Sequence, residues 1–133
     1  MKVVIDTNVL VSALMNVNGT PARILALALN GKLKVLYDNR ILFEYIDVLS
    51  RREFGFENEV INNLLVYFKS DGEYINADST LLEFTDETDK KFYEVYKSGK
   101  AHALITGNIK HFPKEKTILR PKDFIQAFDD GGY

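Results

Sequence analysis

The sequence contains no cysteine and no tryptophan, and it has only three prolines and two histidines in 133 residues. Because cysteine is absent, disulfides and thiolate metal ligands are excluded, and a metal ion would depend on oxygen ligands or on His102 and His111. No apolar run approaches the roughly 20 residues of a membrane span. Asp6 and Asn8 interrupt the apolar N-terminal segment, which argues against a signal peptide. We therefore expect a cytoplasmic protein that does not enter a membrane.

An excess of positive charge is also lacking, since 17 Lys and Arg face 19 Asp and Glu for a net charge of −2. This balance argues against a protein that coats nucleic acid through its bulk charge, although it allows a local basic rim around an acidic pocket. The length suits one domain, residues 1–133. A chain of this size buries roughly two-thirds of its unfolded surface and needs no disulfide or structural metal.

Short apolar and β-branched segments alternate with amphipathic ones along the chain. The apolar segments predict four strands and a possible fifth: 3–5, 33–37, 73–75 (the possible one), 103–106 and 117–119. The segments between them predict helices, with caps and breakers at their ends: from Thr7 or Asn8 to 15, 20–29, from Asp38 or Asn39 to about 52, 58–68, 86–97 and 121–128. We expect residues 129–133 to be frayed. Alternation of this kind indicates an α/β fold with a parallel sheet of four to five strands and helices on both faces.

Several acidic or amide side chains fall where such a sheet would gather them. Asp6 ends the first strand, and Asn108 lies two residues past the fourth. Glu44 lies in the helix after the second strand, and Asp86 and Asp89 begin the helix before the fourth. Since functional crevices in parallel sheets lie outside the carboxyl ends of the strands, we expect three or four of these oxygen ligands around one crevice.

Clustered carboxylates repel one another unless a cation is present, and Mg²⁺ binds a few carboxylates while keeping several waters. Such an ion activates a water and stabilises charge on a phosphate, which is the chemistry of phosphodiester hydrolysis. Each acid also has an ordinary explanation when taken alone. Asp6 suits a helix cap, Glu44 a solvated helix face, and Asp86 and Asp89 a helix N-terminus. Their joint placement favours a site.

The segments that carry these acids resemble the PIN domain family of metal-dependent ribonucleases. "VVIDTNVLVSAL" and the proline-initiated helix after it resemble the start of that family. "ILFEYIDVLSRREF" (41–54) resembles its helix with the second acid, and "DETDKKFYEVYKSGKAHALITGNIKHFP" (86–113) its acid-rich helix and "TGD" turn. The resemblance covers nearly the whole chain. It implies a three-layer α/β/α sandwich, cleavage of RNA with Mg²⁺ or Mn²⁺ and, as in many small members, a toxin that a protein antitoxin inhibits.

Carried over by position, the resemblance assigns roles to particular residues. It implies that Asp6, Glu44 and Asp89 bind the metal, that Asp86 assists or caps, and that Asn8 and Thr106 are polar supports. Two positions depart from the family pattern: Asn108 replaces the Asp of "TGD", and His102 replaces another acid. Asn108 still offers an oxygen but no charge, so we expect a second ion to bind weakly or not at all.

For the substrate, we expect Arg40 and Lys110 to flank the acidic pocket, with Arg40 in contact with an RNA phosphate or with a carboxylate of an inhibitor. Two further hypotheses stay open. A catalytically weakened domain of the same fold, which binds RNA or protein without cutting, is supported by Asn108. A phosphoacceptor signalling domain shares the fold class, but no lysine follows the fourth strand directly, so we rank it low. Dimerisation is common in the resembled family, and the aliphatic faces of the early helices would suit a homodimer.

Overall fold

A computed structural model describes residues 1–131 of the chain. Its centre is a five-stranded sheet in the order β3-β2-β1-β4-β5, and every neighbouring pair is parallel. The strands are short: β1 Lys2–Ile5, β2 Lys34–Tyr37, β3 Glu73–Tyr74, β4 Ala103–Ile105 and β5 Ile118–Leu119. The central strands β1 and β4 are covered on both faces, since their apolar side chains from 3–5 and 103–105 have no exposed surface. This buried pattern explains why both strands are continuous apolar runs.

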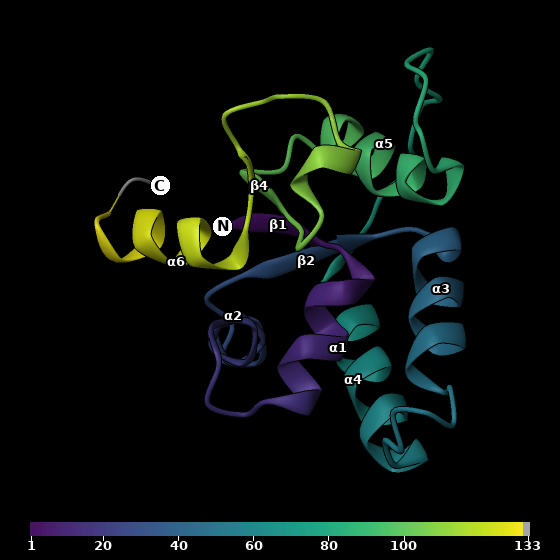
Figure 1. Ribbon diagram of the computed structural model, residues 1–133, viewed down its shortest axis with the longest axis vertical. Helices are drawn as coiled ribbons and strands as arrows, with labels where there is room; N and C mark the ends of the chain where they lie inside the picture. The colour runs from purple at the N-terminus through teal and green to yellow at the C-terminus, as the bar shows by residue number, and fades with distance from the viewer. Residues whose placement is uncertain (132–133) are drawn as a thin grey trace.

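Six α-helices flank the sheet: α1 Thr7–Met15, α2 Thr20–Leu29, α3 Asn39–Leu49, α4 Asn58–Asp71, α5 Lys90–Ser98 and α6 Pro121–Asp129. Figure 1 shows α5 above the sheet and α1, α2, α4 and α6 below it, with α3 running down beside α1. Helices thus cover both faces of a parallel sheet, and the predicted α/β fold is confirmed.

Several predicted boundaries are wrong. Neither Thr7 nor Asn8 caps α1, because Asp6 occupies the N-cap position and its side chain makes no capping hydrogen bond. The helix expected from residue 86 is split into a 3-10 turn, η1 (Glu87–Asp89), followed by α5. Helix α3 stops at Leu49, three residues earlier than expected, while α4 continues to Asp71.

The C-terminal prediction is corrected in part. Helix α6 continues through Asp129, whose carboxylate accepts two hydrogen bonds from the Arg23 guanidinium of α2. That ion pair holds the last turn of α6, so residue 129 is not frayed. The rest of the expected frayed tail includes residues 132 and 133, which lie outside the described residues.

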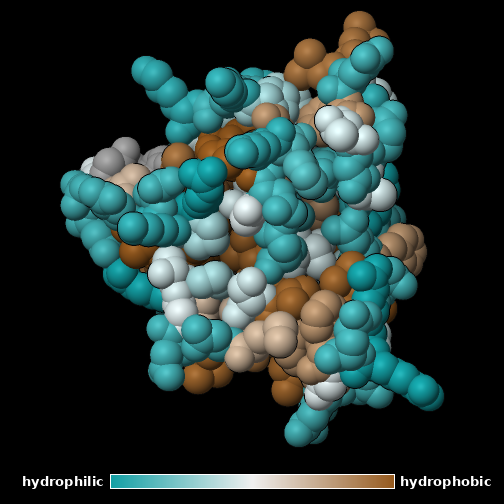
Figure 2. All heavy atoms as spheres, viewed as in Figure 1, coloured by the Kyte–Doolittle hydropathy of each residue, from teal (hydrophilic) through white to brown (hydrophobic). Residues whose placement is uncertain are grey.

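The face shown in Figure 2 is mainly hydrophilic, with hydrophobic side chains gathered at its lower centre and at the tip of a loop at the upper right. Leu81, in the loop between β3 and α5, is 98% exposed, and Leu82 beside it is 46% exposed. Within residues 1–131 every helix is too short or too polar to cross a lipid bilayer.

Candidate active site

Asp6 lies where β1 and β4 end side by side. Its backbone N–H donates to the carbonyl of Ile105 at 2.9 Å, and its side chain is buried. Carboxylate Oδ2 accepts hydrogen bonds from Thr106 Oγ1 at 2.7 Å and from Asn8 Nδ2 at 3.1 Å. Asn8 Oδ1 in turn accepts from the Gly107 N–H at 2.9 Å. Asn8 and Thr106 therefore hold the Asp6 carboxylate and join the ends of the two strands.

Burial raises the pKa of Asp6 from its usual value of 3.8 to about 6. The hydrogen bond from Thr106 lowers this pKa, while the nearby charges of Asp89 and Glu44 raise it further. Ionised Asp6 therefore destabilises the folded protein when no cation is near. A cation beside the carboxylate would offset part of this free-energy cost.

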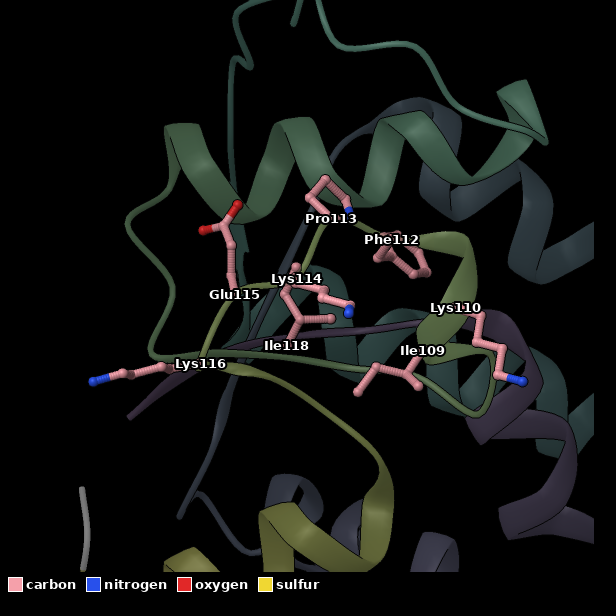
Figure 3. A pocket seen from close by; sticks show the side chains of 8 residues that line it. All are labelled: Ile109, Lys110, Phe112, Pro113, Lys114, Glu115, Lys116 and Ile118. Atoms are coloured by element: carbon pink, nitrogen blue, oxygen red, sulfur yellow. The ribbon is translucent and has the colours of Figure 1, made fainter.

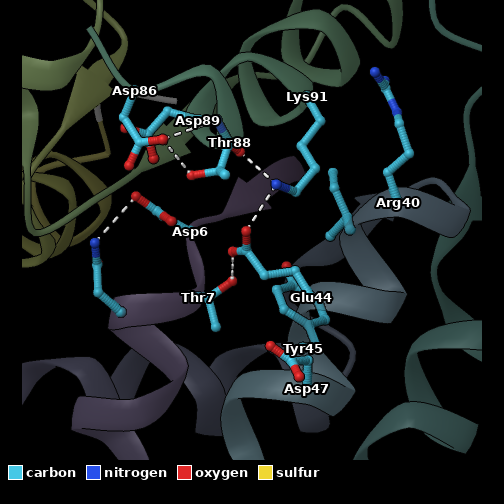
Figure 4. A network of polar contacts seen from close by, with 12 residues as sticks. Asp6, Thr7, Arg40, Glu44, Tyr45, Asp47, Asp86, Thr88, Asp89 and Lys91 are labelled. Carbon is cyan, nitrogen blue, oxygen red and sulfur yellow. Dashed lines mark hydrogen bonds and ion pairs between the residues drawn. The ribbon is translucent and has the colours of Figure 1, made fainter.

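Glu44 projects from the second turn of α3 toward Asp6. Asp38 fixes the start of that helix, because its Oδ1 accepts from the Ile41 N–H at 3.0 Å. Glu44 Oε2 accepts a short hydrogen bond from Thr7 Oγ1, and Oε1 lies 2.7 Å from the ammonium of Lys91. Figure 4 shows Lys91 reaching from α5 to a point between Glu44 and the Thr88 carbonyl, to which it also donates. The α3 acid is thus paired with a cation of the protein itself.

Asp89 is the last residue of η1, and Asp86 is the N-cap of that turn; Figure 4 shows both above Asp6, whereas Glu44 lies to the right of Asp6. Asp89 Oδ2 lies 3.1 Å from His111 Nδ1; burial, with the charge of Asp86, raises the pKa of Asp89. The Asp86 carboxylate is exposed and caps η1, accepting from the Thr88 N–H and hydroxyl. These two hydrogen bonds lower the pKa of Asp86. Asp86 therefore orders the turn that presents Asp89.

These acids act on one another electrostatically. The charges of Asp89 and Glu44 raise the pKa of Asp6, and the charge of Glu44 raises the pKa of Asp89. Within residues 1–131, however, no three Asp, Glu, His or Cys side chains lie close enough to one another to hold a metal ion. The hard oxygens of Asp6, Glu44 and Asp89 suit Mg²⁺ or Mn²⁺. A shared ion would compete with Lys91 for Glu44 and with His111 for Asp89.

The other predicted site residues lie farther out. Arg40 is 49% exposed, and its guanidinium binds Asp38 and Glu94 at 2.6 and 2.7 Å, pointing away from Asp6 in Figure 4. Asn108 is exposed, and its backbone N–H donates to Thr106 Oγ1. Lys110 is exposed in the 3-10 turn η2 (Ile109–His111). Arg40 is therefore engaged within the protein, whereas Lys110 stays available to a phosphate.

Sequence reasoning missed the partners of the acids. Lys91 contacts Glu44, and His111 contacts Asp89. His102 lies at the opposite end of the sheet, where its Nδ1 accepts a hydrogen bond from the Lys2 N–H. Lysine in an amphipathic helix and histidine in a turn normally face solvent, so the sequence held no signal for either contact. Only the packing of α5 against α3 and the sheet defines them.

Comparison with known proteins agrees with the fold. A PIN domain model matches residues 2–110, which include Asp6, Glu44, Asp89 and Asn108. The chain is 34% identical over 145 aligned positions to the uncharacterized protein MJ1680 of Methanocaldococcus jannaschii, covering 97% of this chain and 92% of that protein. The phosphoacceptor hypothesis has no support from these matches. The chain belongs to the PIN domain family, a family of typically metal-dependent nucleases.

Proposed function

We propose that the chain is an endoribonuclease that hydrolyses RNA phosphodiester bonds with Mg²⁺ or Mn²⁺. The observation that supports this most is the environment of Asp6. A carboxylate that is buried at a strand end, with two further carboxylates close enough to raise its pKa, carries its negative charge at a cost that a bound cation would offset. Such groups with displaced pKa values are concentrated at functional sites.

The chain's own residues have separable roles in this proposal. Asp6, Glu44 and Asp89 would bind the ion, which would supply an activated water and stabilise charge on the phosphate. Asn8 and Thr106 orient the Asp6 carboxylate through the hydrogen bonds described above. A ligand carboxylate held by such neighbours loses little freedom on binding a metal, and neighbours of this kind tune affinity strongly.

A second candidate is a domain that binds RNA or a protein without cutting. Two observations favour it: Asn108 supplies no charge, and Lys91 already pairs with the Glu44 carboxylate. Both would weaken metal binding relative to a site with four free acids. Cleavage assays separate the two candidates directly.

The test uses labelled RNA with purified protein and Mg²⁺ or Mn²⁺. We expect cleavage by the native chain, none after chelation, and a loss of at least 100-fold in Asp6→Asn and Glu44→Gln. Asp47→Asn is the matched control, because Asp47 lies on α3 with its side chain 75% exposed and pairs with Arg51. Cleavage that persists in Asp6→Asn would come from a contaminant or another site. Binding of RNA without cleavage would support the second candidate.

We further propose that the protein acts in the cytoplasm as the toxin of a toxin–antitoxin pair and forms a homodimer. The resemblance to small family members supports both roles. For the dimer, an apolar hollow of about 360 Å³ between α1, α2 and α4 offers a surface lined by Leu14, Leu25, Leu29, Val60, Leu64 and Tyr67. A short neighbouring gene whose product binds this chain and stops cleavage would establish the toxin role. Sedimentation of Leu29→Glu beside the native chain tests the dimer.

A further inference from the structure

A cavity of about 520 Å³ lies beside β5, at the edge of the sheet (Figure 3). We call it the β5 pocket. Its apolar lining includes Ile109, Phe112 and Ile118, and its charged lining includes Lys110, Lys114 and Lys116. The volume falls in the range of roughly 300–1,000 Å³ that is typical of ligand sites. The residues that match the PIN domain model end at 110, so most of this pocket comes from chain beyond the match.

The charge of the β5 pocket is positive and uncompensated. Within residues 1–131 no carboxylate lies within ion-pair distance of Lys110, Lys114 or Lys116. The one acid in the lining, Glu115, is engaged elsewhere: Lys97 lies 3.0 Å from its Oε1, and the Tyr93 hydroxyl donates to Oε2. Figure 3 shows Glu115 turned toward α5, while Lys110 and Lys116 extend outward on opposite sides. The ligand should therefore combine an apolar part with negative charge.

The β5 pocket is connected to the acidic site through η2. A smaller cavity of about 230 Å³ shares Ile109 and Lys110 with it and is also lined by Asn108, His111 and Arg120. His111 in turn contacts Asp89. A basic path thus leads from the acids past Lys110 to the pocket, and a polymer cut at the acids would have to continue along the surface beside them.

We propose that the β5 pocket receives an unpaired base of single-stranded RNA, with the flanking phosphates bound by Lys110 and Lys114. This inference rests on the proposed function and adds a strand-binding subsite to it. Unpaired bases are commonly recognised through their apolar faces on aromatic or aliphatic side chains, with cations tracking the backbone. An acidic protein segment has similar chemistry, but continuity with the acidic site favours the strand.

The test measures binding without cleavage, in the Asp6→Asn background with chelator. A labelled 12-nucleotide oligouridylate is titrated by fluorescence anisotropy at several salt concentrations. We expect Lys110→Gln and Lys114→Gln each to weaken binding about 5- to 10-fold, and the slope of log K against log salt to fall by about 0.7 for each lysine. Lys32→Gln is the matched control, since Lys32 is exposed just before β2, at the amino-terminal edge of the sheet.

A second measurement detects the base itself without altering the pocket. Methyl NMR of isoleucine should show shifts at Ile109 and Ile118 with the oligouridylate and much smaller shifts with a base-free strand of equal length. If the native chain cleaves RNA but neither lysine variant nor either methyl responds, the pocket inference is wrong and the proposed function stands. Absence of both cleavage and RNA binding overturns both. Saturable binding of an alternating Glu-Leu peptide that Lys114→Gln abolishes, with RNA binding unchanged, overturns the inference in favour of a protein occupant.

Discussion

At the scale of single residues, Asp6 links stability to function. Its pKa rises from 3.8 to about 6 on folding, so the folded state binds the proton more tightly than the unfolded state. The stability of the metal-free protein therefore falls as pH rises between about 4 and 6, and the penalty is complete above about pH 6. At 1.36 kcal/mol per pKa unit this penalty amounts to about 3 kcal/mol.

We accordingly predict that Asp6→Asn stabilises the metal-free protein at pH 7.5 by up to about 3 kcal/mol. The amide oxygen of Asn still accepts from Thr106 and Asn8, while the costly charge is removed. The gain should fall to roughly half at pH 5, where Asp6 is mostly protonated in the native fold. Urea denaturation in the presence of a chelator, at pH 7.5 and at pH 5, measures this gain in the free energy of unfolding. A variant that is less stable than the native chain at pH 7.5 would contradict the proposed cost of burying this charge.

Lys91 gives a second prediction at this scale. Its ammonium pairs with Glu44 and its side chain is only 12% exposed, so a divalent ion must compete with it for the same carboxylate. Lys91→Met should tighten Mn²⁺ binding by about 5- to 10-fold, as measured by calorimetry, independently of its effect on cleavage. Lys90→Met is the control, because within residues 1–131 Lys90 forms an ion pair only with the exposed Glu87, at 3.8 Å. Equal or weaker Mn²⁺ affinity in Lys91→Met would show that Lys91 does not compete with the ion.

At the scale of elements, α3 and α5 are joined by two ion pairs of opposite polarity. Arg40 of α3 binds Glu94 of α5, and Glu44 of α3 binds Lys91 of α5. Glu94 is 5% exposed, and its other oxygen accepts from the Thr80 N–H at 2.7 Å, which attaches the β3–α5 loop to the same network. Helix α3, which carries Glu44, and helix α5, which begins directly after Asp89, are therefore held in register by charge as well as by packing.

Removing the Glu94 charge should loosen this connection. We predict that Glu94→Gln lowers the free energy of unfolding by about 2 kcal/mol, because it leaves the Arg40 charge and the Thr80 amide poorly paired. Faster hydrogen exchange at the Thr80 amide should accompany the loss. Glu87→Gln, whose carboxylate is 73% exposed, should leave both measurements unchanged. If Glu94→Gln unfolds at the same urea concentration as the native chain, the network contributes little to the docking of α5.

The elements themselves were largely readable from the sequence. Buried strands in a parallel sheet are continuous apolar runs, so β1, β2 and β4 were predicted within one residue of each end. Boundaries set by tertiary contacts were not predictable. Helix α6 extends to Asp129 because Arg23 of α2 reaches it, a contact between positions 106 residues apart. The same distinction applies to the candidate site. The acids were predictable from strand and helix ends, whereas the contacts of Lys91 and His111 depend on how α5 and η2 pack.

At the scale of the whole molecule, the three acids come from the end of β1, from α3 and from η1, which are far apart in the chain. An ion that binds all three can bind only the folded state, so it should stabilise the entire fold by about 2.7 kcal/mol at 100 times its dissociation constant. For a chain of this length that corresponds to a rise in Tm of roughly 10 °C. Mn²⁺ should produce this shift in the native chain and in Asp47→Asn.

The same experiment distinguishes a shared ion from surface binding. Asp6→Asn, Glu44→Gln and Asp89→Asn each remove one ligand from a different element, and each should abolish most of the shift in Tm with Mn²⁺. Surface carboxylates that bind an ion singly would give a small shift that no one of these substitutions removes. Loss of the shift in only one of the three variants would mean that the elements do not close around a common ion, and the proposed nuclease mechanism would then lack its metal centre.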